Sequence, residues 1–193
     1  MNHSILPLSL LLLFAACTVN ENGQLDLTRS PNLPVNETDS YANLYSQNFP
    51  AELAVLPPID ESLSSLAPKG EIREAIRTFL LDRNYSVLSN DYLDRNYKAV
   101  EASTFSMDKT GAVELLIHFW DERKARAGGV LTYDIEATFY GEKGVVLANL
   151  RSARQTKLSP GELSANPPQV RYLKLLRHVA SSLLNEVPSP PRL

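Results

Sequence analysis

The chain has 193 residues, of which 44% are hydrophobic and 21% charged, with a formal net charge of -3 and a single cysteine. This near-neutral mixture of charges argues against nucleic acid or an anionic lipid surface as the main partner. One cysteine excludes a framework of intramolecular disulfides, and the length favours one domain with an appendage.

The opening segment, residues 1–16, predicts a secretory signal. Its apolar run is too short to span a bilayer and ends in Ala15 and Ala16, immediately before Cys17. The Ala-Ala-Cys ending resembles a bacterial lipobox, although Phe14 stands where the lipobox usually has Leu and the segment has no Lys or Arg. The resemblance implies cleavage before Cys17 and acylation of its sulfur and its new amino terminus. An ordinary secretory signal followed by an unpaired cysteine stays open as the alternative.

Acylated Cys17 would hold the mature chain on a membrane. Two or three acyl chains give stable anchoring where one chain gives only marginal binding. In lipoproteins of the enteric type an Asp after the cysteine retains the protein at the inner membrane. Thr18 stands there in this chain, so the resemblance implies the periplasmic face of the outer membrane. No second apolar run has the length of a transmembrane helix, and the lipid is therefore the only membrane attachment that the sequence predicts.

The segment 17–50 predicts a lipidated cysteine followed by a flexible linker. It is rich in Asn, Asp, Thr and Pro, and its apolar residues are too sparse to offset the entropy of ordering the chain. Near its end, a small aromatic cluster is formed by Tyr41, Leu44, Tyr45 and Phe49. Either these residues pack on the edge of the domain or they form a docking peptide.

Residues 51–188 predict one α+β periplasmic domain, followed by a Pro-rich tail at 189–193. Apolar runs and alternations predict strands at 53–56, 85–88, 113–120, 131–139 and 145–154, and helical periodicity predicts helices at 69–83, 92–97 and 169–186. The resulting order β-α-β-α-β-β-β-α predicts a mixed, mainly antiparallel sheet with helices on one face.

The apolar faces of these elements follow from periodicity. Alternation in 113–120 places Val113, Leu115, Ile117 and Phe119 on one face and Glu114, Leu116, His118 and Trp120 on the other. The stripe of the first helix is Ile72, Ala75, Ile76, Phe79 and Leu80, and that of the last helix is Tyr172, Leu173, Leu176, Val179, Ala180 and Leu183.

Three short motifs carry a resemblance to a known family: Val55-Leu56-Pro57-Pro58, then Tyr85-Ser86-Val87 after a helix, then Gly111-Ala112-Val113 before a meander. Together with the element order they resemble the domain shared by the TolB N-terminal region and the CsgG-like periplasmic lipoproteins. The chain departs from that pattern at Asn84, where Gly is usual, and after Ala112, where no Asp follows. The resemblance implies a non-enzymatic component of an envelope complex for transport, secretion or wall synthesis.

Residues that could carry chemistry are sparse. Of the histidines, His3 leaves with the signal, while His118 lies in a strand and His178 in the last helix, and both are expected to be structural or solvated. Acylation of Cys17 removes a free thiol, and the histidine spacing does not match a metal motif. A Ser-His-Asp triad built from distant residues stays open. We therefore predict no catalytic residue, no metal site and no cofactor.

The segment 119–129 is the predicted partner surface, because aromatic and Arg side chains dominate interface hot spots. The candidate residues are Phe119, Trp120, Arg123 and Arg126. At least one of the two aromatic residues is expected to pack in the core instead. We expect an envelope protein as partner, contact with the membrane through the lipid, and no nucleic acid; self-association stays open. The alternative functions are a small-ligand or peptidoglycan-binding module and a hydrolase with an unrecognised site.

Overall fold

Three long strands joined in a meander, β5 (Thr110–Asp121), β6 (Val130–Tyr140) and β7 (Val146–Lys157), form the centre of the fold. Their antiparallel pairing confirms the meander predicted from the sequence. The computed structural model describes residues 39–44, 49–62, 67–97, 102–105, 107 and 109–190, with 39–44, 103 and 142 described by their backbone alone.

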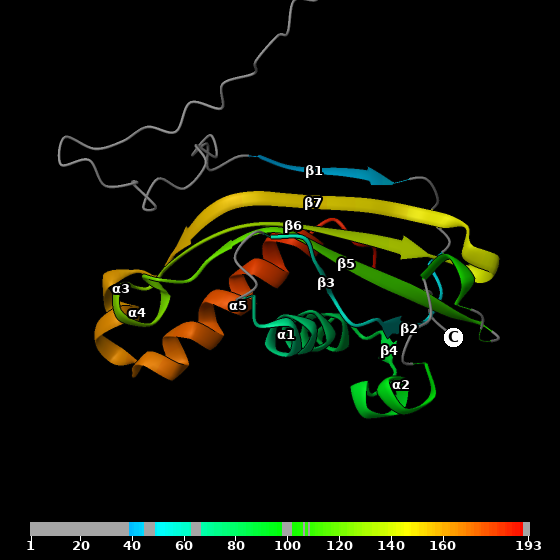
Figure 1. The fold of residues 1–193 in the computed structure, drawn as a ribbon, viewed down its shortest axis with the longest axis horizontal. Coiled ribbons are helices and arrows are strands. Elements are labelled where there is room, and N and C mark those ends of the chain that lie inside the picture. The colour runs from blue at the N-terminus through cyan, green and yellow to red at the C-terminus, as the bar shows by residue number, and fades with distance from the viewer. Residues whose placement is uncertain are drawn as a thin grey trace, which may run out of the picture. The chain divides into compact units, whose positions relative to one another are not determined.

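The described strands form one seven-stranded sheet in the order β1-β7-β6-β5-β2-β4, with β3 pairing beside β5 (Figure 1). The other strands are β1 (Asp39–Leu44), β2 (Glu52–Val55), β3 (Ile59–Asp60) and β4 (Ser86–Val87). β1 pairs antiparallel with β7, whereas β2, β3 and β4 are paired in parallel. The sheet is thus mixed and mainly antiparallel, as predicted.

Two long helices, α1 (Lys69–Asp82) and α5 (Pro168–Leu184), lie side by side on one face of the sheet (Figure 1). The described short helices are α2 (Asn90–Asn96), α3 (Ala125–Gly128), α4 (Pro160–Ala165) and the 3-10 turns η1 (Ala102–Thr104) and η2 (Glu142–Gly144). This arrangement confirms the α+β class.

Helix α1 follows its predicted stripe. Ile72, Ile76 and Leu80 are buried against the sheet, and the helix ends where Asn84 adopts a positive φ of 68°. Asn tolerates this left-handed conformation better than most residues because its side chain can hydrogen-bond locally. The helix stop expected at Asn84 is therefore confirmed.

Helix α5 departs from its predicted stripe at one position. Leu175 is fully buried, whereas Leu173 is 55% exposed. With 3.6 residues per turn, the buried face that holds Tyr172, Leu176 and Val179 also takes in Leu175, and Leu173 lies beyond its margin. The assignment of Leu173 to the core was wrong.

A second, smaller apolar cluster lies near the start of β2 and β5. Along these strands, its residues alternate with residues whose side chains belong to the main core. Ala54 of β2 pairs with Ala112 of β5, and both contribute to this cluster with Leu93 of α2 and Phe105. The alternation of side chains along a strand places this cluster on the opposite face of the sheet from α1 and α5.

Strand β1 lies inside the segment 17–50 that was expected to be a linker. Its backbone pairs with β7 from Asp39 opposite Ala153 to Leu44 opposite Ala148. The hydrogen bonds of an edge strand come from the neighbouring backbone, so a polar sequence can join a sheet without an apolar stripe of its own. Asp39–Leu44 therefore belongs to the domain.

Of the aromatic cluster predicted before the domain, the structure describes the side chain of Phe49. Phe49 is buried, and its ring meets that of Phe139 edge-on at 5.4 Å. This contact confirms packing on the domain for Phe49. Tyr45, the predicted signal at 1–16 and Cys17 lie outside the described residues.

The end of the described chain is fastened to the end of α1. The Tyr85 hydroxyl donates to the carbonyl of Pro188 at 2.6 Å, and Arg83 Nη1 donates to the carbonyl of Val187 at 2.6 Å. Burial raises the pKa of Tyr85 to about 12, against an opposing effect of Arg83. The segment that follows α5 is thus part of the folded domain.

Candidate functional site

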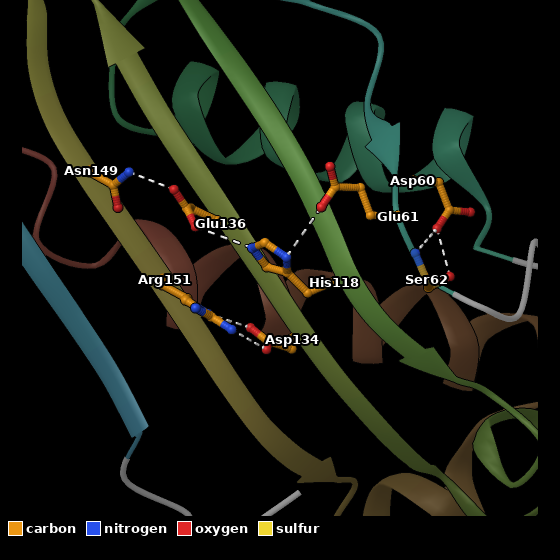
Figure 2. A network of polar contacts seen from close by, with 8 residues as sticks. All are labelled: Asp60, Glu61, Ser62, His118, Asp134, Glu136, Asn149 and Arg151. Atoms are coloured by element: carbon orange, nitrogen blue, oxygen red, sulfur yellow. Dashed lines mark hydrogen bonds and ion pairs between the residues drawn. The ribbon is translucent and has the colours of Figure 1, made fainter. Parts of the chain in front are cut away.

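The face of the sheet turned away from α1 and α5 carries a network of polar side chains on β3, β5, β6 and β7 (Figure 2). Inward side chains such as Leu115, Ile117 and Ile135 are fully buried, whereas outward ones such as Glu136 and Arg151 are partly exposed. A strand with one buried face and one wet face alternates in this way. We refer to this polar side of β5, β6 and β7 as the open face.

A β-bulge at His118 determines which aromatic residue reaches the open face. Ile117 pairs with Ile135, but the next pair along β5 is Phe119 with Asp134, so His118 is the extra residue. A bulge sets two residues of one strand against one of its partner and re-aims the side chains that follow. Phe119 is consequently opposite the outward residue Asp134 and partly exposed, and Trp120 is opposite the buried Tyr133.

The bulge corrects the alternation expected for 113–120. Trp120, expected on the polar face, is 2% exposed and its ring lies 6.2 Å from that of Tyr133. Phe119, expected in the core, is on the open face. The sequence held one signal of this shift: strict alternation placed Trp120, a large apolar residue, on the same face as Glu114 and His118.

His118 links three strands through two carboxylates. Its Nε2 lies 3.2 Å from Glu136 Oε2, and its Nδ1 lies 3.8 Å from Glu61 Oε2 next to β3 (Figure 2). Glu136 Oε1 also accepts a hydrogen bond of 2.6 Å from Asn149 Nδ2 of β7. The expectation that His118 is structural or solvated did not include these partners, because they come from distant segments.

Two bidentate Arg–Asp pairs flank Phe119 along the open face. Arg151 donates through Nε and Nη2 to the two carboxylate oxygens of Asp134 at 2.8 and 2.6 Å (Figure 2). Arg123 does the same to Asp121 at 2.9 and 2.7 Å. The hydrogen bonds from Arg123 are the main reason that the pKa of Asp121 is lowered. Paired in this way, each guanidinium is held in one orientation by the carboxylate of its Asp partner.

Arg126 lies apart from the open face, on helix α3. Its guanidinium lies 4.3 Å from the ring centre of Tyr172 on α5. The Tyr172 hydroxyl donates a short hydrogen bond to Glu122, which also accepts one of 3.3 Å from Trp120 Nε1. Burial is the main cause that raises the pKa of Tyr172. These contacts fasten the turn after β5 to α5.

The four residues predicted from 119–129 therefore divide among three places. Phe119 and Arg123 lie on the open face, Trp120 lies in the core, and Arg126 lies on α3 against Tyr172. Since Trp120 is buried, Phe119 is the one of the two predicted aromatic residues that a partner could contact.

The contacts of Ser62 and His118 bear on the Ser-His-Asp triad that the sequence left open. Ser62 donates its hydroxyl to Asp60 at 2.6 Å, while the contacts of His118 are with Glu61 and Glu136 (Figure 2). Within the described ranges, no cluster of three or more His, Cys, Asp or Glu side chains could hold a metal ion. In the same ranges, no helix combines the length and the apolar character needed to cross a membrane.

Comparison with known proteins finds similarity only among solved structures. No protein-family profile matches the chain, and no curated protein matches it. Lipoprotein GNA1162 from Neisseria meningitidis is 16% identical, with 69% of this chain and 100% of that chain covered and a TM-score of 0.46. The PelC dodecamer from Paraburkholderia phytofirmans is 10% identical over 75% and 97%, with a TM-score of 0.44. A minor lipoprotein from Acinetobacter baumannii is 10% identical over 68% and 87%, with a TM-score of 0.29. These similar structures thus include bacterial lipoproteins.

Proposed function

We propose that this chain is a lipoprotein held at the periplasmic face of the outer membrane by acylated Cys17, and that its domain binds an envelope protein without catalysing a reaction. The domain would act as a binding or assembly component of a complex for transport, secretion or wall synthesis. That role is the one implied by the resemblance to the TolB N-terminal and CsgG-like domains.

The observation that carries the binding role is the place of Phe119. The bulge at His118 sets this ring on the open face, opposite Asp134, between the pairs Arg151–Asp134 and Arg123–Asp121. Aromatic and Arg side chains near the centre of a patch are what interface hot spots are made of.

The fixed geometry of the two Arg residues favours binding. Immobilising a long, flexible side chain at an interface costs roughly 0.5–1.5 kcal/mol. Because the carboxylates of Asp134 and Asp121 already hold Arg151 and Arg123, part of this cost is met before a partner arrives. A partner of matching shape would cover Phe119 and hydrogen-bond to the remaining polar groups of the network.

The experiment is site-specific photocrosslinking in cells, with the native lipidated protein. A probe replaces Phe119 on the open face, and a matched control probe replaces Leu81, which is 40% exposed on α1. We expect one discrete envelope protein to be captured from position 119 and not from 81. Arg123→Glu should weaken this adduct, because the substitution places two acidic groups where Arg123 pairs with Asp121.

Two outcomes would overturn the proposal. Equal capture of the same proteins from positions 119 and 81 would mean that the adducts report proximity rather than a binding surface. Recovery of glycan or a small molecule in place of a protein from position 119 would indicate a ligand-binding module.

A further inference from the structure

Helices α3 and α4 and the first turns of α5 lie together at one end of the domain, where they form a second surface (Figure 1). Arg171 Nη1 donates to the carbonyl of Ala127 at 3.1 Å, which joins α5 to α3. The amide of Leu158 donates to the carbonyl of Gly129 at 2.9 Å, which joins the end of β7 to the same turn. Segments that are distant in the sequence thus share one surface.

The exposed charges of this surface have one sign. In residues 122–129 and 157–178, every ionisable side chain that the structure leaves exposed is basic: Arg123, Lys124, Arg126, Lys157 and Arg177. Arg123 is neutralised by its pair with Asp121. We call the other four residues, with the apolar Val170 and Leu173, the basic end.

The acidic groups of these segments are partly buried and already engaged. Glu122 accepts hydrogen bonds from Tyr172 and Trp120. Glu162 accepts from Ser159 in a capping box at the start of α4 and pairs with Lys174 at 3.4 Å. The cations of the basic end are therefore not matched by exposed carboxylates of the same segments.

Apolar side chains lie among these cations. Leu173 is 55% exposed and Val170 is 36% exposed. Val170, Leu173 and Arg177 are three or four residues apart on α5, so they form one stripe along the outer side of the helix. Apolar groups interspersed with Lys and Arg are typical of surfaces that lie in a membrane interface.

The first described strand, β1, begins towards this end of the sheet. β1 begins at Asp39 opposite Ala153, four residues before Lys157, with which β7 ends. At about 3.3 Å per strand residue, Asp39 lies ~13 Å along the sheet from the level of Lys157. The polypeptide that would carry the lipid thus joins the domain on the side of the basic end.

We propose that the basic end lies on the anionic phospholipid surface of the membrane that holds the acylated Cys17. This inference rests on the proposed lipid anchor for the identity of the membrane. The contact with lipid would be made by the cations of the basic end, which complement the anionic headgroups, and by the exposed side chains of Val170 and Leu173. Anchoring at Cys17 and contact through the basic end would together fix which side of the domain faces the lipid.

The test uses the full mature chain with Cys17→Ser, so that no acyl chain contributes. Its binding is measured by co-sedimentation with vesicles of mixed phosphatidylglycerol and phosphatidylcholine, and with vesicles of phosphatidylcholine alone. We expect binding to the anionic vesicles that weakens as salt is raised, because salt screens the charges. Each cation removed should lower the partition coefficient roughly fivefold, and its reversal to Glu by more than that.

Matched charge reversals assign the binding to the basic end. Lys124→Glu with Arg177→Glu should lower binding to anionic vesicles at least about 25-fold, at roughly fivefold for each cation lost. Arg95→Glu with Lys143→Glu changes the net charge equally, but at α2 and at the β6–β7 turn, and should lower it much less. Leu173→Ser should weaken binding as well, since it removes exposed apolar area. Unfolding in urea, compared between the variants, controls for loss of fold.

Several results would overturn the inference. These are absence of binding to anionic vesicles, equal binding to phosphatidylcholine alone, and equal losses in both double variants. If the chain does not bind vesicles and a probe at position 173 crosslinks to an acidic protein in cells, that protein rather than the membrane contacts the basic end. Because the Cys17→Ser chain carries no lipid, a negative result here leaves the acylation of Cys17 untouched, and a failure of acylation leaves the vesicle result untouched.

Discussion

Phe119 lies opposite Asp134 in the β5–β6 pair, and this pairing turns the following residue, Trp120, against Tyr133 in the core. One extra residue, His118, produces this exchange of faces. An aromatic side chain is thereby presented on the open face while the largest side chain of the strand stays buried. The two aromatic neighbours should consequently differ in what they contribute to stability and to binding.

Trp120→Ala should destabilise the domain by about 3–5 kcal/mol, because it removes a buried aromatic side chain and leaves a cavity. Phe119→Ala should cost about 1 kcal/mol or less, since its ring is partly exposed. Urea unfolding of the two variants measures both free energies. Equal losses would mean that the bulge does not separate the two side chains in solution.

Gly129→Ala should destabilise the domain by roughly 1–2 kcal/mol or more. Gly129 has a φ of 61°, and an added Cβ would lie 2.4 Å from Leu163 Cδ2. A left-handed backbone costs an L-residue about 1–2 kcal/mol before any steric overlap is counted. The control is Gly128→Ala, where the nearest atom to an added Cβ is Lys124 Cβ at 3.8 Å. If both variants unfold at the same urea concentration, the turn after α3 is not built as described.

The stability of the domain should fall at alkaline pH through Tyr85. Its pKa is raised from 10.0 to about 12 in the folded state, so the folded chain holds this proton more tightly than the unfolded chain. The stabilisation is complete below pH 10 and is lost as the pH rises towards 12. Tyr85→Phe should make the fall over this range shallower, because it removes the group that titrates. An unchanged slope in Tyr85→Phe would contradict the buried hydroxyl.

Thr18→Asp should move the protein from the outer to the inner membrane. The resemblance to enteric lipoproteins implies that an Asp after the acylated cysteine prevents transfer to the outer membrane. Separation of the two membranes on a density gradient measures the change, and Thr18→Ser serves as the control. Finding the wild-type chain in the inner membrane would contradict the proposed location.

The elements with a strong local pattern could be predicted from the sequence. The stripe of α1 with its stop at Asn84, and the meander of β5, β6 and β7, follow from periodicity and turn residues. Strand β1 could not be predicted, because its polar segment gains its hydrogen bonds from the backbone of β7. The strand propensity of a segment does not indicate whether another strand lies beside it in the fold.

The candidate site was predictable only in part. The aromatic and basic composition of 119–129 indicated a surface, but periodicity alone could not reveal the extra residue His118. The partners of His118, Glu61 and Glu136, come from separate strands. The basic end was hidden for the same reason: its cations lie in separate segments of a chain whose overall charge is only -3.

Acylation of Cys17 is the central property that we propose for this protein. The decisive measurement is metabolic labelling with a clickable fatty-acid analogue in cells expressing the wild-type chain or Cys17→Ala, followed by membrane fractionation. A high-salt wash removes protein held by surface charge, such as contact through the basic end, before the membranes are analysed. We predict that the wild-type chain is labelled and stays with the washed membranes, and that Cys17→Ala is unlabelled and is released. Label that persists in Cys17→Ala, or its absence from the wild-type chain, would contradict the account.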